Sequence, residues 1–178
     1  MTRRRGSLLW LGLIIALGIG LGVLTLAPLR RSDGSQPIAS LVGQSAPALA
    51  ADDLDGRAWS VDNAEGRLVW INFLATWCPP CRTEMPAMQA LAESHPDELL
   101  ILGVDWGEER TAVDSFVARY GIEYPILLDP TLDNYYRWAQ ASGLPRHSFV
   151  RDGVIVREVI GPLDPADMVT ILAKLLAS

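Results

Sequence analysis

Two cysteines separated by two prolines, Cys78 and Cys81, are the residues of this sequence best suited to redox chemistry. The apolar run at residues 68–74 precedes them and predicts a strand that is buried on both faces of a sheet. Proline cannot continue a strand but fits the first turn of a helix, so Pro79 and Pro80 predict a helix that begins directly after Cys78. The motif is therefore expected to be a strand, a dithiol and a helix in succession.

The position of Cys78 at a helix N-terminus is expected to make its thiol ionise easily. The thiolate is the reactive form of cysteine, and the unpaired N–H groups and positive dipole end of a helix stabilise a negative sulfur. Cys81 lies nearly one turn further along the same face, where it can form a disulfide with Cys78 while facing the interior. We predict that Cys78 attacks a disulfide and that Cys81 resolves the mixed disulfide.

Three other roles for the cysteine pair are weighed against this one. A purely structural disulfide would close a loop of four residues, which stabilises by about 2 kcal/mol, against about 3 kcal/mol for a loop of about 15 residues. A structural zinc site needs four ligands, and the sequence offers only the two cysteines, His95 and His147, without a second cysteine pair. A copper(I) site remains open, because two soft thiolates suit that metal.

The segment Asn72–Pro86, with the sequence NFLATWCPPCRTEMP, resembles the signature of the TlpA/ResA family of membrane-anchored thioredoxin-like thiol:disulfide oxidoreductases. These proteins are relatives of the cytochrome c maturation thioredoxins. The resemblance covers essentially the whole soluble region, and its further motifs are Val42-Gly-Gln-Ser-Ala-Pro47, Leu54-Asp-Gly56, Gly143-Leu-Pro145 and Asp152-Gly153. It implies a thioredoxin-like α/β fold, reductant activity, no cofactor, and substrates such as apocytochrome c or other exported proteins.

The resemblance also assigns roles to residues around the dithiol. Glu84 lies three residues beyond Cys81 on the same helix face, and a glutamate at this matching position serves the active site of the family. We expect a partly buried carboxylate that handles protons as the thiols open and close. Asn72 stands where ordinary thioredoxins carry a buried acid, which shifts any proton role toward Glu84, although a satisfied polar group in the sheet would explain it equally well. Trp77 is expected to shield Cys78 from water.

The segment Gly143-Leu-Pro145 precedes a predicted strand, and in the resembled fold it faces the dithiol. We therefore predict a cis Leu144-Pro145 peptide bond. The Leu144 backbone and Trp77 are then expected to bind an extended substrate beside Cys78.

Neither histidine receives a catalytic role from the sequence, because spacing alone cannot place a general base within reach of the thiol. His147 replaces the small polar residue expected two places after the family's proline, so it is a candidate for tuning substrate choice. Copper carriers of similar fold pair their cysteines with a later histidine, and His147 would complete such a copper(I) site with Cys78 and Cys81.

The N-terminal segment Leu8–Leu29 contains 22 residues without a charge. As a helix it would be about 33 Å long, which matches a hydrocarbon core of about 30 Å. Arg3, Arg4 and Arg5 precede it, whereas Arg30 and Arg31 follow it. With the N-terminal amine counted, this small excess of positive charge favours a cytoplasmic N-terminus and an extracytoplasmic, periplasmic or outer, catalytic domain. A cleaved signal peptide is the alternative, but its apolar region is normally about 7 to 15 residues long.

The domain boundaries follow from these segments. Residues 1–31 are expected to form a membrane anchor, residues 32–41 a linker, and residues 42–178 the thioredoxin-like domain. Beyond Arg31 ten basic residues stand against 21 acidic ones, so nucleic acid is not an expected partner. The expected partners are proteins with disulfides and a membrane thiol-electron donor. Peroxidase activity is not expected, because the dithiol lacks the surrounding pattern of such enzymes.

The remaining elements follow from apolar periodicity and turn residues. An N-terminal β-hairpin is expected around a type I′ turn at Asp55-Gly56, and a two-residue Asp152-Gly153 loop is expected between two antiparallel strands. The region 67–128 predicts a βαβ unit with a parallel strand pair, and a short helix is expected from Asp133 to Ala141. We therefore predict a central mixed sheet with helices on both faces.

Overall fold

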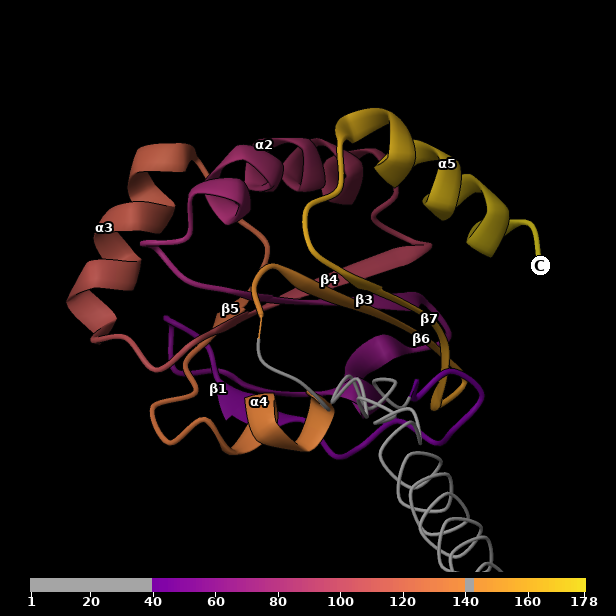
Figure 1. Ribbon diagram of the computed structural model, residues 1–178, viewed down its shortest axis with the longest axis horizontal. Helices are drawn as coiled ribbons and strands as arrows, with labels where there is room; N and C mark the ends of the chain where they lie inside the picture. Colours follow the sequence, from indigo (N-terminus) through magenta and orange to yellow (C-terminus); the bar gives the residue numbers. More distant parts are fainter. Residues whose placement is uncertain (1–39, 140–142) are drawn as a thin grey trace, which may run out of the picture. The chain divides into compact units, whose positions relative to one another are not determined.

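A computed structural model describes residues 40–139 and 143–178 (Figure 1). The predicted membrane anchor at 1–31 and the linker, except for its last two residues, lie outside the described residues. In the part that is described, no helix combines the length and apolar character that a membrane span requires.

A five-stranded mixed sheet forms the centre of the domain (Figure 1). Its strands, in their spatial order, are β5 (Ile126–Leu127), β4 (Leu99–Asp105), β3 (Leu68–Leu74), β6 (Arg146–Arg151) and β7 (Val154–Ile160). The pairs β3–β4 and β4–β5 are parallel, whereas β3–β6 and β6–β7 are antiparallel. The predicted mixed sheet is therefore confirmed, with the strand that leads into the dithiol at its centre.

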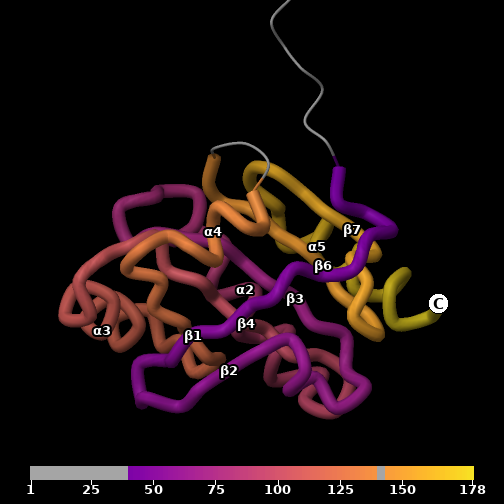
Figure 2. Tube along the Cα trace, turned by 90° about the horizontal axis from the view of Figure 1, so that it is seen from below, coloured from indigo at the N-terminus to yellow at the C-terminus, as the bar shows by residue number. Residues whose placement is uncertain are grey.

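Helices cover both faces of this sheet. Figure 1 shows α2 and α5 above the sheet and α4 below it, and Figure 2, seen from below, shows α4 and the small strands β1 and β2 on the near side. The helices are α2 (Pro79–Ser94), α3 (Arg110–Tyr120), α4 (Asp133–Trp138) and α5 (Pro165–Leu176), with a 3-10 turn η1 (Val61–Ala64) before β3. Helix α4 is shorter than predicted, because the backbone of Ala139 has an extended conformation that ends the helix.

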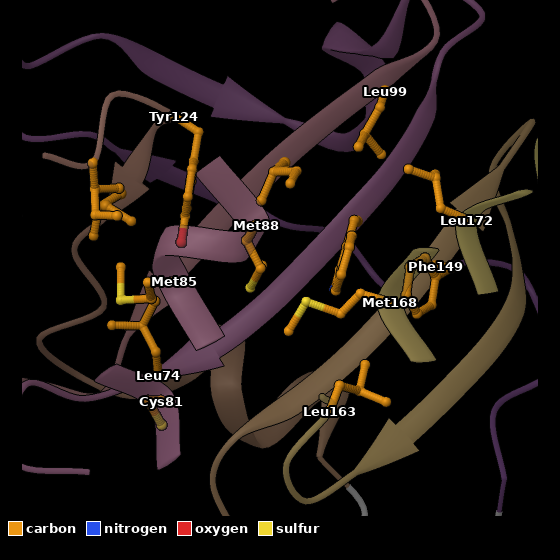
Figure 3. Packing of buried hydrophobic residues seen from close by; sticks show 14 of the residues in the cluster. Leu74, Cys81, Met85, Met88, Leu99, Tyr124, Phe149, Leu163, Met168 and Leu172 are labelled. Atoms are coloured by element: carbon orange, nitrogen blue, oxygen red, sulfur yellow. The ribbon is translucent and has the colours of Figure 1, made fainter. Parts of the chain in front are cut away.

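Strand β3 contributes to two hydrophobic cores because its side chains alternate between the faces of the sheet. Trp70 and Leu74 belong to the core under α2, α3 and α5, where Figure 3 shows Leu74 with Met85, Met88 and Phe149. The side chains of β3 on the other face pack toward α4; they are Val69, Ile71 and Phe73. Every residue of β3 is buried, as the apolar run predicts.

A two-stranded antiparallel sheet lies where the sequence predicts a hairpin, and it consists of β1 (Ala50–Asp52) and β2 (Ala58–Ser60). Its connection is not the predicted type I′ turn, because Gly56 but not Asp55 has a positive φ. The buried Asp53 carboxylate explains the difference: it accepts hydrogen bonds from the Arg57 backbone N–H and from the Trp59 indole, and this organises a longer loop. The Asp152-Gly153 loop, by contrast, has positive φ at both residues (49° and 74°), so the predicted two-residue turn is confirmed there.

Candidate active site

The dithiol lies at the N-terminus of α2, where the sequence places it. Cys78 is the N-cap residue, and Pro79 and Pro80 occupy the first two helical positions. Cys78 and Cys81 form a disulfide, and the Cys81 backbone N–H points at the Cys78 sulfur at 3.4 Å. Both residues are buried, with 3% of Cys78 and 0% of Cys81 exposed, so the more accessible of the two sulfurs is that of Cys78. The backbone N–H groups of this turn can stabilise a thiolate on that sulfur.

A groove of about 360 Å³ opens over Cys78. It is lined by Trp77, Cys78, Pro79, Pro80, Trp106, Gly143 and Leu144. Trp77 is 55% exposed and packs against Trp106 with ring centroids 5.3 Å apart, so it forms one wall of the groove rather than a closed lid over the sulfur. Trp106, which no motif in the sequence singles out, is part of this wall.

The opposite wall of the groove is the segment before β6. The Leu144-Pro145 bond is cis, as predicted. Pairing of β3 with β6 brings Arg146 opposite Phe73, which places this segment beside the loop that leads from β3 to Cys78. Among the described residues, the Leu144 backbone has no backbone hydrogen-bond partner.

Glu84 lies on α2 one turn beyond Cys81, and its side chain is more deeply buried than the partly buried carboxylate that the sequence predicts, with 3% exposed. One carboxylate oxygen accepts a hydrogen bond from the Leu163 backbone N–H. The carboxylate also lines a second cavity of about 410 Å³, together with Pro80, Thr83, Pro162, Leu163, Asp164, Pro165 and Asp167. Most of the residues that line this cavity are exposed to solvent.

Glu84 also affects a neighbouring phenol. Tyr124 precedes β5 and is buried, and its side chain extends toward α2 in Figure 3. Burial and the Glu84 carboxylate together raise the pKa of Tyr124, so this phenol stays protonated.

His147 lies on β6 and is completely buried, so it does not line the groove over Cys78, and its influence on substrate choice stays a prediction. Its Nδ1 accepts a hydrogen bond from the Trp70 indole at 3.2 Å and lies 3.2 Å from the Asn72 amide nitrogen. Asn72 is therefore a satisfied polar group in the sheet. His95 caps the other end of α2, one helix length from the dithiol.

A pair of carboxyl groups near the dithiol was missed by the sequence analysis. The Glu108 carboxylate accepts hydrogen bonds from the backbone N–H and the hydroxyl of Thr76, both at 2.5 Å, two residues before Cys78. Asp105, at the end of β4, accepts the Glu108 backbone N–H at 2.7 Å. Burial and the adjacent Glu108 raise the pKa of Asp105 from 3.8 to about 7. The signal in the sequence was an acid at the carboxyl end of a parallel strand, where α/β proteins commonly place functional groups.

The metal-binding alternatives depend on how the described His, Cys, Asp and Glu side chains are arranged. Within residues 40–139 and 143–178, no group of three or more His, Cys, Asp or Glu side chains is arranged to hold a metal ion. His147 is held instead by Trp70 and faces Glu84, so the described residues do not combine it with the two cysteines as the copper(I) alternative requires.

A cysteine pair at a helix N-terminus, facing a cis-proline segment on a mixed sheet, is the arrangement of a thioredoxin-like thiol-disulfide oxidoreductase. The AhpC/TSA family model matches residues 42–158, and the chain belongs to that family. The predicted thioredoxin-like α/β fold with its central mixed sheet is thus confirmed, and so is the predicted enzyme class.

Three similar proteins agree with this class. The chain is 39% identical over 90 residues to the thioredoxin-like protein YneN of Bacillus subtilis, a match that covers 49% of the chain but only 53% of YneN. It is 31% identical over 122 residues to the thiol-disulfide oxidoreductase ResA of Bacillus thuringiensis, covering 67% of the chain and 70% of ResA. The crystal structure of a thiol:disulfide interchange protein from Chlorobium tepidum superposes with a TM-score of 0.66 at 27% identity, covering 78% of this chain and 99% of the other.

Proposed function

We propose that the protein is a membrane-held reductant that works outside the cytoplasm and reduces disulfides in exported proteins such as apocytochrome c. The observation that carries the proposal is the groove over Cys78, in which a buried sulfur at a helix N-terminus lies beside Leu144, whose backbone has no backbone partner among the described residues. An extended substrate chain that pairs with Leu144 would bring its disulfide onto the Cys78 sulfur.

The reaction begins with the reduced protein. The Cys78 thiolate attacks one sulfur of the substrate disulfide, and the other substrate sulfur leaves as a thiolate. The product is a mixed disulfide between Cys78 and the substrate. The groove walls, Trp77 and Leu144, hold the substrate chain during this step.

The second step depends on Cys81, which is completely buried and must lose its proton before it can attack. Glu84, one turn further along α2, accepts that proton and passes it to solvent through the cavity it lines. The Cys81 thiolate then attacks the Cys78 sulfur and releases the second substrate thiolate. Two electrons have passed to the substrate, and the protein is left with the Cys78–Cys81 disulfide seen here.

Regeneration requires a dithiol donor, and a membrane thiol-electron conduit is the donor class that a membrane-held, extracytoplasmic protein can reach. The direction of the reaction, reductant rather than oxidant, rests on the family resemblance and on the Pro79-Pro80 spacer. An equilibrium titration of the Cys78/Cys81 pair against glutathione tests it, since a reductant must have a potential below that of the glutathione couple.

Insulin reduction with a dithiol donor tests the activity itself, and an anaerobic copper(I) titration of the reduced protein tests the rival function. We expect catalysed insulin reduction and no stoichiometric copper(I) complex that requires His147. Tight copper(I) binding that is lost in His147→Gln, together with absence of insulin reduction, would contradict the proposal.

Glu84→Gln is expected to slow release of the mixed disulfide without slowing its formation. A neutral amide cannot take the Cys81 proton, so the resolving step at neutral pH should slow by roughly 10²-fold, the lower end of what general bases contribute. Stopped-flow kinetics of the two steps measure this. Glu93→Gln, the same substitution at an exposed position near the C-terminal end of α2, is the control and should leave both steps unchanged.

The N-terminal segment gives a separate prediction. Full-length protein is expected to sediment with membranes, whereas a chain that starts at about Ser32 should remain in the soluble fraction and keep its insulin-reducing activity. Cell fractionation followed by N-terminal sequencing makes the measurement. Mature protein that begins at Pro28 would show that the segment is a cleaved signal.

A further inference from the structure

Two buried polar atoms face each other behind the dithiol. His147 Nε2 on β6 and Glu84 Oε2 on α2 lie 3.5 Å apart, and the two side chains are 0% and 2% exposed. Within the described residues neither atom has another hydrogen-bond partner. Burying a polar atom without a hydrogen-bond partner costs free energy of folding. Two such atoms that face each other therefore point to a functional role.

The other ring nitrogen of His147 determines where the proton is. The Trp70 indole can only donate a hydrogen bond, and it points at Nδ1 from 3.2 Å. Nδ1 must therefore carry the lone pair, and a neutral imidazole then carries its single proton on Nε2. That proton faces Glu84.

We propose that His147 is a positioning residue for Glu84: its Nε2–H, fixed in one tautomer by Trp70, orients the Glu84 carboxylate to take the proton of Cys81. This inference rests on the proposed function, since it assumes that Glu84 serves the resolving step. Two N–H groups, from Leu163 and His147, then contact the two carboxylate oxygens, and such contacts favour the charged form of a carboxylate.

Other charged or titratable groups near Glu84 come from three elements. Tyr124, before β5, is buried and stays protonated because burial and Glu84 raise its pKa. Asp164 and Asp167, at the start of α5, line the same cavity as Glu84 but are exposed to solvent. The cysteines lie one turn earlier on α2. The Tyr124 hydroxyl can donate a hydrogen bond but has no partner within reach among the described residues, whereas His147 Nε2 lies 3.5 Å from the Glu84 carboxylate. His147 is therefore the side chain placed to supply a donor.

The experiment separates the two thiol steps. The reduced full-length protein is mixed with dithiodipyridine, and thiopyridone release is followed by stopped-flow absorbance across the pH range. The first phase reports attack by Cys78, and the second reports attack by Cys81 on the mixed disulfide. The variants are His147→Leu, which removes the N–H, and His147→Gln, whose amide can again donate to Glu84 and accept from Trp70.

We expect the second phase of His147→Leu to have its pH midpoint about one unit higher than in the wild type, the size expected for loss of one donor to a charged group. His147→Gln should restore the wild-type midpoint, and the first phase should be the same in all three proteins. A second phase of His147→Leu that superimposes on the wild type would overturn the proposal, as would a His147→Gln profile that follows His147→Leu.

A measurement on the unmodified protein covers the case in which His147→Leu does not fold. Long-range 1H–15N spectra of the oxidised protein at neutral pH should show the ring proton of His147 on Nε2. A neutral ring with its proton on Nδ1 would refute the inference. A failure of the proposed function would give a different result in the stopped-flow experiment. Either Cys78→Ser would retain the first phase, or Glu84→Gln would leave the second phase unchanged.

Discussion

Cys78→Ser is expected to reduce the rate of insulin reduction to that of the uncatalysed reaction. The serine hydroxyl is not ionised at neutral pH and is no nucleophile toward sulfur, and Cys81, which is 0% exposed, cannot reach a substrate disulfide in its place. The expected loss is therefore complete rather than partial. Turbidity of reduced insulin measures it, with free dithiol alone as the baseline.

Cys81→Ser is the matched variant, and it should behave differently. Cys78 still lies at the helix N-terminus and still attacks, but no second thiol releases the substrate, so the mixed disulfide accumulates. Covalent complexes should appear on non-reducing gels and disappear when a reductant is added. If both single variants trapped partners to the same extent, the assignment of Cys78 as attacker and Cys81 as resolver would be wrong.

Asp105→Asn is expected to stabilise the protein above neutral pH and to remove part of the pH dependence of its stability. Burial and Glu108 raise the pKa of Asp105 from 3.8 to about 7, so the folded protein holds a proton that the unfolded chain has already lost. The contribution of the Asp105 carboxyl to the free energy of unfolding is largest below about pH 4, and it decreases as the pH rises to about 7. The total is on the order of 4 kcal/mol, at about 1.4 kcal/mol for each pH unit.

The asparagine side chain in Asp105→Asn does not ionise, so it adds no pH dependence to the free energy of unfolding. Its amide oxygen can accept the Glu108 backbone N–H that Asp105 accepts now, and its NH₂ group can donate to the Glu108 carboxylate. Chemical denaturation at pH 5 and pH 8 measures the change. Asp97→Asn, at an exposed carboxylate beyond α2, serves as the control and should leave the difference between the two pH values unchanged. An Asp105→Asn protein as pH-dependent as the wild type would contradict the assignment.

The parts of the site that the sequence predicts are local. The apolar run of β3, the two prolines and the dithiol are contiguous, so strand, N-cap and helix follow from neighbouring residues. The Asp152-Gly153 turn is equally local, because both residues tolerate a positive φ. The prediction at Asp55-Gly56 fails on the same motif, since the side chain of Asp53 competes for the backbone N–H groups of that loop.

The parts of the site that the sequence does not predict depend on how strands that are far apart in the sequence pair with each other. Contact of His147 with Trp70 and Asn72 requires the pairing of β6 with β3, and nothing in the local pattern around His147 specifies its partner. The hydrogen bond from the Thr76 hydroxyl to the Glu108 carboxylate likewise joins two loops that follow neighbouring strands. The periodicity of apolar residues identifies which residues are buried, but it does not show which buried polar side chains contact each other.

The pairing of β3 with β6 also has a consequence for biosynthesis. It joins residues 75 positions apart in sequence, whereas the β3–β4 register pairs Leu68 with Leu99. Closing the longer loop costs roughly 0.8 kcal/mol more in chain entropy, and a ribosome delivers β6 after the dithiol and α2 have emerged. A nascent chain of 139 residues thus carries both cysteines but lacks the Leu144 wall and the His147 contact. Such a chain exposes a reactive thiol before it has the surfaces that select a partner for it.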